Sequence, residues 1–477
     1  MKPVLNLGAW RNLQGTEGSP ALRLPAHHLV THAVVVGMTG SGKTGLLTVL
    51  VEEAGKAQVP TLVIDVKGDL PNLLLAFPDL APSHLEPWIE RDQDTATPEQ
   101  VALRARELAE QRRVALAECG ISEAELRAYT DSTRVRVLTP GGSAGEPLHM
   151  LSPLERRSSR WDTDPESARD ALTAAISLVL RLLGREPDPA KSREHVLLSV
   201  LAERRLSSGG SADLAALMQD VLEPPIDEIG ALPVDAFMKK AERRSLAAAL
   251  NSLLASPSFA TWREGATLDV ADWLTPREAK TPIVIISVAH LDDEERVLVL
   301  GLVLEEVLSW VRTLPGSQQL RALLVFDEMY GFLPPHPANP PTKRPIVALM
   351  KQARAFGVGV VVATQNPMDL DYRALSNAGI WCLGRLQTDA DRHRVLDGLA
   401  AAQGTSGDVA GLEATLQRLA PRWFVIRNTH SSSPPLLVQP RYAMSLLRGP
   451  MTRTEIQRAR GVALTLPGPC RAPGRVA

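Results

Sequence analysis

The residues with the clearest chemical meaning lie at positions 37–44, which read Gly-Met-Thr-Gly-Ser-Gly-Lys-Thr. An apolar β-branched run precedes them and a helical pattern begins at Lys43, which is the strand–turn–helix setting of a P-loop. In such a loop, backbone N–H groups face phosphate oxygens, the lysine reaches the β- and γ-phosphates, and the threonine binds Mg²⁺. The sequence therefore predicts an ATP site with Mg²⁺. The expected nucleotide contacts are Gly37, Thr39, Gly40, Ser41, Gly42, Lys43, Thr44 and Gly45.

A second apolar run, residues 323–326, ends in the two carboxylates of Asp327 and Glu328. Alone this pattern is weak, because many buried strands end in an acid. With a P-loop upstream it indicates a Walker B strand, in which Asp327 holds Mg²⁺ through water and Glu328 polarises the attacking water as general base. The expected metal ligands are therefore Thr44 and Asp327.

A further strand, predicted over residues 357–363, ends in Thr364, Gln365, Asn366 and Pro367. A polar amide at a strand tip beside the Walker strands suits sensing of the γ-phosphate, and we assign this role to Gln365. For Asn366, which precedes a proline, the alternative is a turn-forming residue.

The elements that must position these side chains alternate along the chain. Helical patterns follow most of the predicted strands, and this alternation predicts an α/β fold with a mainly parallel sheet covered on both faces. The Pro-rich segment 334–345 is expected to form a rigid surface loop at the carboxyl edge of the sheet, where α/β ligand sites lie. The predicted strands cover residues 33–36, 61–65, 135–138, 283–288, 323–326, 357–363, 381–383 and 423–426.

Several regions fall outside this alternation. Residues 1–32 are expected to form an N-terminal arm, residues 78–132 a helical hairpin insertion, and residues 141–280 a helical subdomain. The subdomain has helical periodicity at 166–183, 193–205, 212–222 and 233–255. The remaining parts are an ATPase core made of 33–77, 134–140 and 281–440, and an Arg/Pro/Gly-rich tail at 441–477.

Composition limits the cellular compartments and the binding partners that we expect for this protein. The net charge is −2, so a global positive field does not attract nucleic acid, and any DNA-binding surface must be local. The 3 cysteines are far apart and in no metal spacing, which fits a reducing cytosol. The sequence shows no signal-peptide pattern and no apolar stretch near the ~20 residues of a transmembrane helix. We therefore expect a cytoplasmic protein without a membrane partner.

Together the motifs resemble the HerA branch of the HerA/FtsK superfamily, whose members are hexameric RecA-like ATPases that pump DNA. The resemblance covers residues 30–440 and implies a RecA-like P-loop NTPase core with a large helical insertion. It also implies a homo-oligomer, a hexameric ring with ATP bound between neighbouring subunits. The motifs that carry it are the P-loop and residues 64–69, 326–328, 351–357, 364–367 and 375–379.

The resemblance adds three site residues. Asp65 matches the acidic residue after the family's second strand, near the nucleotide. Arg354 and Arg385 match arginines that approach nucleotide, one of them from the adjacent subunit, where an arginine stabilises charge on the transferring phosphoryl group. We favour Arg354 for that role, and for each arginine the alternative is a structural salt bridge. The expected catalytic residues are Glu328, Lys43, Arg354, Arg385 and Gln365.

The chain also departs from the family pattern. Members usually carry an N-terminal β-barrel before the P-loop, whereas here only residues 1–32 precede the first strand, and many relatives have proline in place of Val66. The tail is expected to be either a disordered arm that touches phosphates or an altered end of a longer protein. Its charged residues from position 449 are Arg453, Glu455, Arg458, Arg460, Arg471 and Arg475.

The predicted function is an ATP-driven motor, a translocase or helicase on double-stranded DNA. One alternative is a type IV secretion-type ATPase, which shares this core. Another is a ring scaffold whose ATP-gated assembly activates a partner nuclease or other effector. Turnover stimulated by duplex DNA supports the motor, whereas turnover that depends only on a protein partner supports the scaffold.

Overall fold

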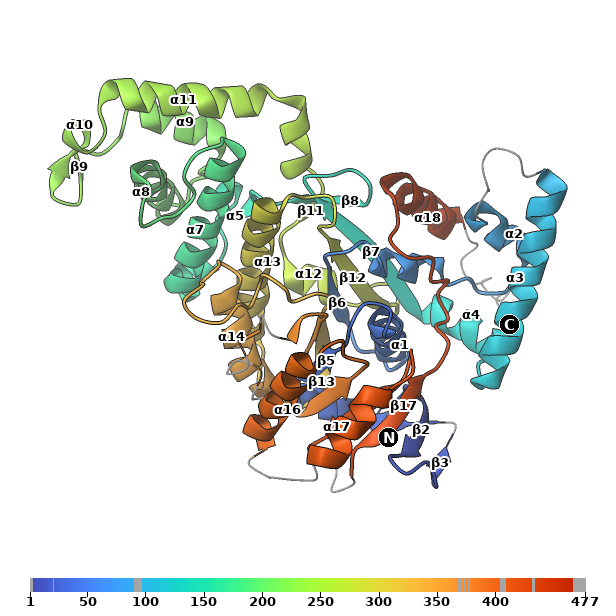
Figure 1. Ribbon diagram of the computed structural model, residues 1–477. Helices are drawn as coiled ribbons and strands as arrows, with labels where there is room; N and C mark the ends of the chain where they lie inside the picture. Colours follow the sequence, from blue (N-terminus) through green and yellow to red (C-terminus); the bar gives the residue numbers. More distant parts are fainter. Residues whose placement is uncertain are drawn as a thin grey trace, which may run out of the picture.

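One sheet organises the molecule, and the described residues contribute 13 strands to it (Figure 1). The computed structural model describes residues 3–19, 21–89, 97–367, 370–371, 375, 378–403, 409–430 and 434–465. In spatial order the strands are β11 (Ala266–Thr267), β8 (Glu146–His149), β7 (Thr133–Pro140), β12 (Thr281–Ser287), β6 (Thr61–Asp65), β13 (Ser317–Phe326), β14 (Phe356–Thr364), β5 (Ala33–Val36), β15 (Ile380–Leu383), β16 (Phe424–Asn428), β17 (Leu436–Pro440), β2 (Gly8–Asn12) and β3 (Gly18–Ser19).

Neighbouring strands are parallel from β11 to β15 and antiparallel from β15 to β3. The predicted mainly parallel α/β sheet is therefore confirmed. The N-terminal residues join it, because β2 pairs with β17 at the antiparallel end. A separate pair, β1 (Val4–Asn6) and β4 (Arg23–Pro25), leads into the sheet.

The sheet separates two hydrophobic cores. In β5, Val34 and Val36 belong to one core, whereas Ala33 and Val35 belong to the other, as the period of a strand requires. Helices α7 (Pro165–Leu182), α13 (Asp293–Thr313) and α14 (Lys343–Gln352) cover the first face. The second face is covered by α1 (Lys43–Lys56) and the 3₁₀ helix η2 (Leu70–Leu75).

The helical block projects from one side of the sheet, at the upper left of Figure 1. Its buried apolar side chains belong to the same hydrophobic core as those of α13. Helices lie at the expected positions, except that the helix expected over 233–255 is interrupted and forms two helices. The helices at these positions are α7, α8 (Arg193–Ser207), α9 (Leu214–Leu222), α10 (Val234–Phe237) and α11 (Lys240–Ala255). The expected helical hairpin consists of α3 (Pro98–Glu118) and α4 (Glu123–Ser132), and capping boxes at Thr97 and Ser122 begin both helices.

The tail differs from the expected disordered arm where the structure describes it. Residues of α18 (Arg453–Thr465) pack against η2, and Met451 N–H donates to the carbonyl of Gly68 across 2.9 Å. Arg458 donates to the carbonyl of Pro87 (2.7 Å) and Arg460 to that of Gly145 (2.6 Å). Each of these two arginines therefore ties the C-terminal helix to another part of the chain through one hydrogen bond to a backbone carbonyl. Arg471 and Arg475 lie outside the described residues.

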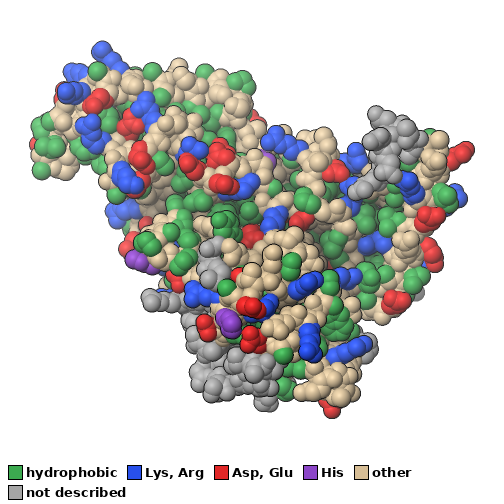
Figure 2. All heavy atoms as spheres, in the orientation of Figure 1, with side chains coloured by type: hydrophobic (Ala, Val, Ile, Leu, Met, Phe, Trp, Pro, Cys, Tyr) green, Lys and Arg blue, Asp and Glu red, His purple; other side chains and the backbone are tan. Residues whose placement is uncertain are grey.

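Two further findings concern the charge on the surface and the length and hydrophobicity of the helices. On the face drawn in Figure 2, basic and acidic side chains are interspersed, in keeping with the net charge of −2. Among the described helices, none is both long and apolar enough to span a bilayer.

Candidate functional site

The P-loop connects the end of β5 to the start of α1. Gly40 and Gly42 have φ angles of 76° and 98°, which glycine adopts without strain. Gly42 is the N-cap of α1, and a Cβ built there would lie 3.1 Å from the Cα of Arg422. Thr44 and Gly45 follow in the first turn of the helix, where free N–H groups and the helix dipole favour an anion.

Neighbouring strands hold the loop by backbone hydrogen bonds. Gly37 N–H donates to the carbonyl of Thr364 (3.3 Å), and Met38 N–H donates to that of Arg385 (2.8 Å). On the other side, Arg422 N–H donates to the carbonyl of Ser41 (2.9 Å). The P-loop is thus fixed by the ends of the strands on both sides of β5.

Lys43 is buried inside the loop. Its ammonium donates to the carbonyls of Gly37 and Met38, the second at 3.1 Å. Burial, and then the positive charge of Lys67, lower the pKa of Lys43 to about 8, whereas Glu328 and Asp327 oppose this shift. An anion entering the loop would restore the charged form of Lys43, because an opposite charge nearby favours ionisation.

Asp327, the predicted Walker B carboxylate, directly follows β13, which is the strand next to β14. Its backbone N–H donates to the carbonyl of Ile64 (3.1 Å), which fixes it at the carboxyl edge of the sheet. The Oδ2 atom is buried without a hydrogen-bond partner among the described residues. Burial, and then the neighbouring Asp65, raise the pKa of Asp327 to about 7. A buried carboxylate oxygen of this kind fits a site for a divalent cation.

The next carboxylate, Glu328, is held by four donors. Its Oε1 accepts from Thr364 Oγ1 (3.0 Å) and from the backbone N–H groups of Gln365 and Tyr330 (3.3 Å each). Its Oε2 accepts from the Lys67 ammonium at 2.6 Å. Glu328 therefore faces the tip of β14 and the turn after β6, beside Asp327.

Gln365 is joined directly to the P-loop. Its Oε1 accepts a hydrogen bond from Thr39 Oγ1 at 2.6 Å. Asn366 forms the turn after the strand, and its N–H donates to Thr364 Oγ1 at 3.1 Å. In the motif at 375–379, Ser376 and Asn377 lie outside the described residues.

Asp65 is fully buried, and its contacts organise a turn. Oδ2 accepts from Ser287 Oγ (2.7 Å), and Oδ1 accepts from the N–H groups of Gly68 (3.0 Å) and Leu70 (3.4 Å). Burial raises the pKa of Asp65 to about 6, against the effect of these hydrogen bonds. In this structure Asp65 thus positions the turn that carries Lys67.

The two predicted arginines lie at opposite edges of the sheet. Arg385 is exposed and follows β15, where its carbonyl binds the P-loop of the same chain. Arg354 is exposed in η5 (Ala353–Ala355), just before the nine residues of β14. A strand of that length spans about 27 Å, so Arg354 is remote from its own P-loop.

Sequence reasoning missed three residues at this site. Lys67 stands in the quoted motif 64–69 but received no role, although it contacts Glu328. Thr364 ends β14 and binds the same carboxylate, which its position at a strand tip could have indicated. Arg422, 4.4 Å above the ring of Tyr442, has a positive φ and lies against Gly42, and no local pattern signals this.

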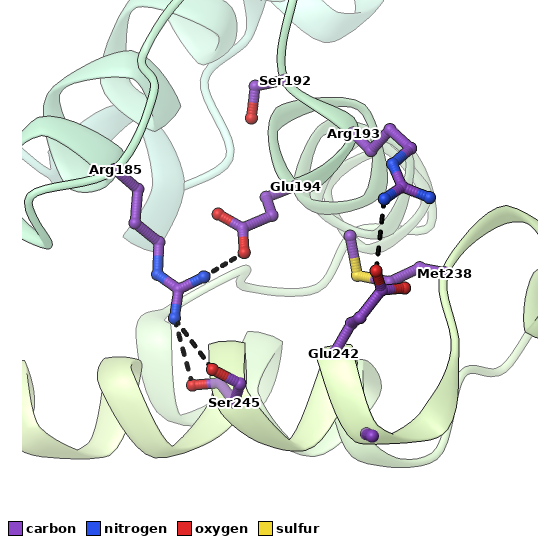
Figure 3. Close-up of a pocket in the computed structure, with 8 residues that line it drawn as sticks. Arg185, Ser192, Arg193, Glu194, Met238, Glu242 and Ser245 are labelled. Carbon is purple, nitrogen blue, oxygen red and sulfur yellow. Dashed lines mark hydrogen bonds and ion pairs between the residues drawn. The ribbon is translucent and has the colours of Figure 1, made fainter.

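A separate hollow of about 520 Å³ lies in the helical block, between α8 and α11 (Figure 3). Arg185 binds Glu194 and the hydroxyl of Ser245 (3.2 Å), and Arg193 lies 3.2 Å from Glu242. Because these charges pair with one another, we assign no ligand to this hollow.

Comparison with known families finds two matching regions. Residues 12–130 match the family model described as the central domain of helicase HerA. Residues 146–373 match the model described as the DNA-binding domain of type IV secretion-system coupling proteins. No curated protein matches the chain.

Comparison with solved structures finds similar proteins over most of the chain. VirB4 of Thermoanaerobacter pseudethanolicus is 13% identical, with a TM-score of 0.50 over 91% of this chain and 96% of that one. The plasmid coupling protein TrwB in complex with ADP and Mg²⁺ is 14% identical, with a TM-score of 0.48 over 94% and 97%. The VirB4 likeness, together with the sheet and the P-loop, confirms the predicted RecA-like P-loop fold.

Proposed function

We propose that this chain is a P-loop ATPase of the HerA/FtsK superfamily and that it hydrolyses ATP to move along double-stranded DNA. The observation that carries the proposal is the meeting of three elements at one edge of the sheet. The P-loop follows β5, the two carboxylates of Asp327 and Glu328 follow β13, and Gln365 follows β14. Hydrogen bonds connect the P-loop to Gln365 and Gln365 to Glu328, and a backbone hydrogen bond fixes Asp327 to β6.

In this proposal the P-loop binds the phosphates of ATP. The N–H groups of the loop and of the first turn of α1 face the phosphate oxygens, and Lys43 exchanges its carbonyl partners for the β- and γ-phosphates. Thr44 and Asp327 hold Mg²⁺, and the unpartnered Oδ2 of Asp327 supports that assignment. When bound, Mg²⁺ neutralises charge on the phosphate oxygens.

Glu328 is the proposed general base. It accepts a proton from the water that attacks the γ-phosphorus, and the bond between that phosphorus and the β–γ bridging oxygen breaks. Gln365 reports the γ-phosphate, since its side chain already binds Thr39 on the P-loop and its N–H binds Glu328. A change at the phosphate is thereby conveyed to the base.

A neighbouring subunit completes the site. The position of Arg354, far along β14 from its own P-loop, supports its action on the nucleotide of an adjacent subunit. Arg385, whose carbonyl binds Met38, is assigned to its own subunit. This arrangement requires a homo-oligomer, and we propose a hexameric ring, with DNA in a channel lined by Lys and Arg.

A second candidate is transport of the type IV secretion kind. It is favoured by the match of residues 146–373 to the coupling-protein model and by the fold shared with VirB4. The motor and the secretion ATPase share the ATP chemistry and differ in what stimulates it.

The test compares ATP hydrolysis by the assembled full-length protein with and without duplex DNA. The proposal expects turnover to rise at least about tenfold with duplex, and Glu328→Gln to bind ATP yet turn over at least ~10²-fold slower. Lys43→Ala should lose nucleotide binding. Turnover indifferent to duplex but dependent on a protein partner would favour secretion or a scaffold that activates an effector.

A further inference from the structure

The two oxygens of the proposed general base have different partners. Glu328 Oε1 accepts from Thr364, Gln365 and Tyr330, whereas Oε2 accepts from the Lys67 ammonium. A positive charge in contact with a carboxylate favours the ionised form and so makes the carboxylate a weaker base. Lys67 therefore has to leave Oε2 before Glu328 can accept a proton from water as a full-strength base.

Lys67 is the donor that can leave. The other three are a backbone N–H beside Glu328 and two groups at the end of β14, all fixed by the strand ends. Lys67 reaches Glu328 with a flexible four-carbon stem, and 29% of its side chain is exposed. Its ammonium therefore moves without a change in the sheet.

The backbone that carries Lys67 is rigid. Asp65 accepts from the N–H groups of Gly68 and Leu70, which closes the turn around Lys67. Met451 N–H binds the carbonyl of Gly68 at 2.9 Å, so the C-terminal segment braces the same turn. A change at Lys67 is thus confined to its side chain.

The destination of the ammonium is the phosphate site. The Lys67 ammonium contacts Glu328, which accepts from the N–H of Gln365, and the side chain of Gln365 binds Thr39 on the P-loop. Lys67 therefore lies beside the P-loop, where a bound γ-phosphate would offer its ammonium a second anionic partner. In ATP, the γ-phosphate places negative charge close to Glu328. ADP lacks the γ-phosphoryl group and therefore offers Lys67 no such partner.

We propose that Lys67 is a latch on Glu328: it holds the carboxylate in the nucleotide-free subunit and moves to the γ-phosphate when ATP binds, which frees the base. The inference rests on the proposed ATPase function and adds to it. It makes Lys67 a second lysine that distinguishes ATP from ADP, and it keeps an empty or ADP-bound subunit from activating water.

The test measures the affinity of the full-length protein for a non-hydrolysable ATP analogue and for ADP. In Lys67→Met, the analogue should bind about tenfold more weakly while ADP binding is unchanged, the size expected for one charge-assisted hydrogen bond. In Glu328→Gln, the ammonium loses its anionic partner, so the analogue should bind more tightly than in the wild type. Adding Lys67→Met to Glu328→Gln should abolish that gain.

Lys240→Met, on the exposed start of α11, is the matched control and should change neither affinity. Equal weakening of both nucleotides in Lys67→Met, or no tightening in Glu328→Gln, overturns the latch. If Lys67→Met does not fold, the affinity of Glu328→Gln for the analogue tests the latch by itself. If the wild type binds the analogue but a variant gives one of these two results, the latch is refuted and the proposed ATPase function is not. If the wild type binds neither nucleotide, the proposed function is refuted as well.

Discussion

Thr39 and Gln365 are joined across the mouth of the P-loop by a 2.6 Å hydrogen bond from the threonine hydroxyl to the amide oxygen. The contact links the phosphate-binding turn to the tip of β14, whose backbone also binds Glu328. In the proposed mechanism, Thr39 and Gln365 alone connect the phosphate site to Glu328.

Replacing Gln365 with alanine should uncouple these two steps. Nucleotide should still bind, because the P-loop is intact, but turnover should fall about 10- to 100-fold, as for the loss of one positioned polar group. The measurement is the nucleotide Kd together with kcat. Asn366→Ala is the neighbouring control, and a Gln365→Ala enzyme with normal kcat would remove Gln365 from the proposed path.

The two arginines should behave differently in mixed assemblies. Lys43→Ala subunits mixed with Arg354→Ala subunits should regain some ATPase activity, because some interfaces then carry an intact P-loop and an intact arginine. Lys43→Ala mixed with Arg385→Ala should regain none, since Arg385 lies beside the P-loop of its own chain. Activity is measured across mixing ratios. Recovery with Arg385→Ala and none with Arg354→Ala would reverse the assignment.

A buried ion pair fixes the P-loop helix to the C-terminal segment. Arg441 binds Glu52 (2.8 Å) and Glu53 (2.9 Å) on α1, and these side chains are 1%, 0% and 4% exposed. Arg441→Met leaves buried carboxylates without their cation, so it should destabilise the fold by about 3–5 kcal/mol. Arg113→Met, which breaks only exposed pairs, should cost about 1 kcal/mol or less. Thermal unfolding of both variants checks this, and equal shifts in Tm would contradict it.

Asp327 should make the nucleotide-free protein less stable at high pH. Its pKa is raised from the ordinary value to about 7, so the folded state holds the proton more tightly than the unfolded chain. The stability gained from the protonated carboxyl is present at low pH and is lost as pH rises toward 7. Asp327→Asn stays neutral, so without Mg²⁺ and nucleotide it should be more stable than the wild type at pH 8, on the order of 2 kcal/mol. The advantage should shrink at pH 5, and a pH-independent difference in Tm would contradict this account.

The local motifs predicted much of this site because their chemistry depends on neighbours in the chain. The P-loop needs a strand, a glycine turn and a helix in succession, and β5 and α1 supply them. Strand order and the partners of charged side chains are long-range properties. For that reason the Lys67–Glu328 pair escaped sequence reasoning, although both residues stand in recognised motifs.

The tail illustrates the same limit. Its many arginines led us to expect a disordered arm. Composition does not show that backbone carbonyls of residues distant in the sequence accept hydrogen bonds from these arginines. Arg458 and Arg460 bind such carbonyls, at Pro87 and Gly145. A truncation that tests for a DNA-touching tail should therefore start after residue 465, where α18 ends, since a cut at 449 would remove packed structure.

Movement along duplex DNA can be measured by the displacement of a short third strand from a linear triplex. With ATP, the wild-type assembly should release the third strand, whereas Glu328→Gln, which retains nucleotide binding, should not. Release should require a duplex long enough to load the ring. A wild-type assembly that hydrolyses ATP at full rate and leaves the third strand in place would contradict the motor.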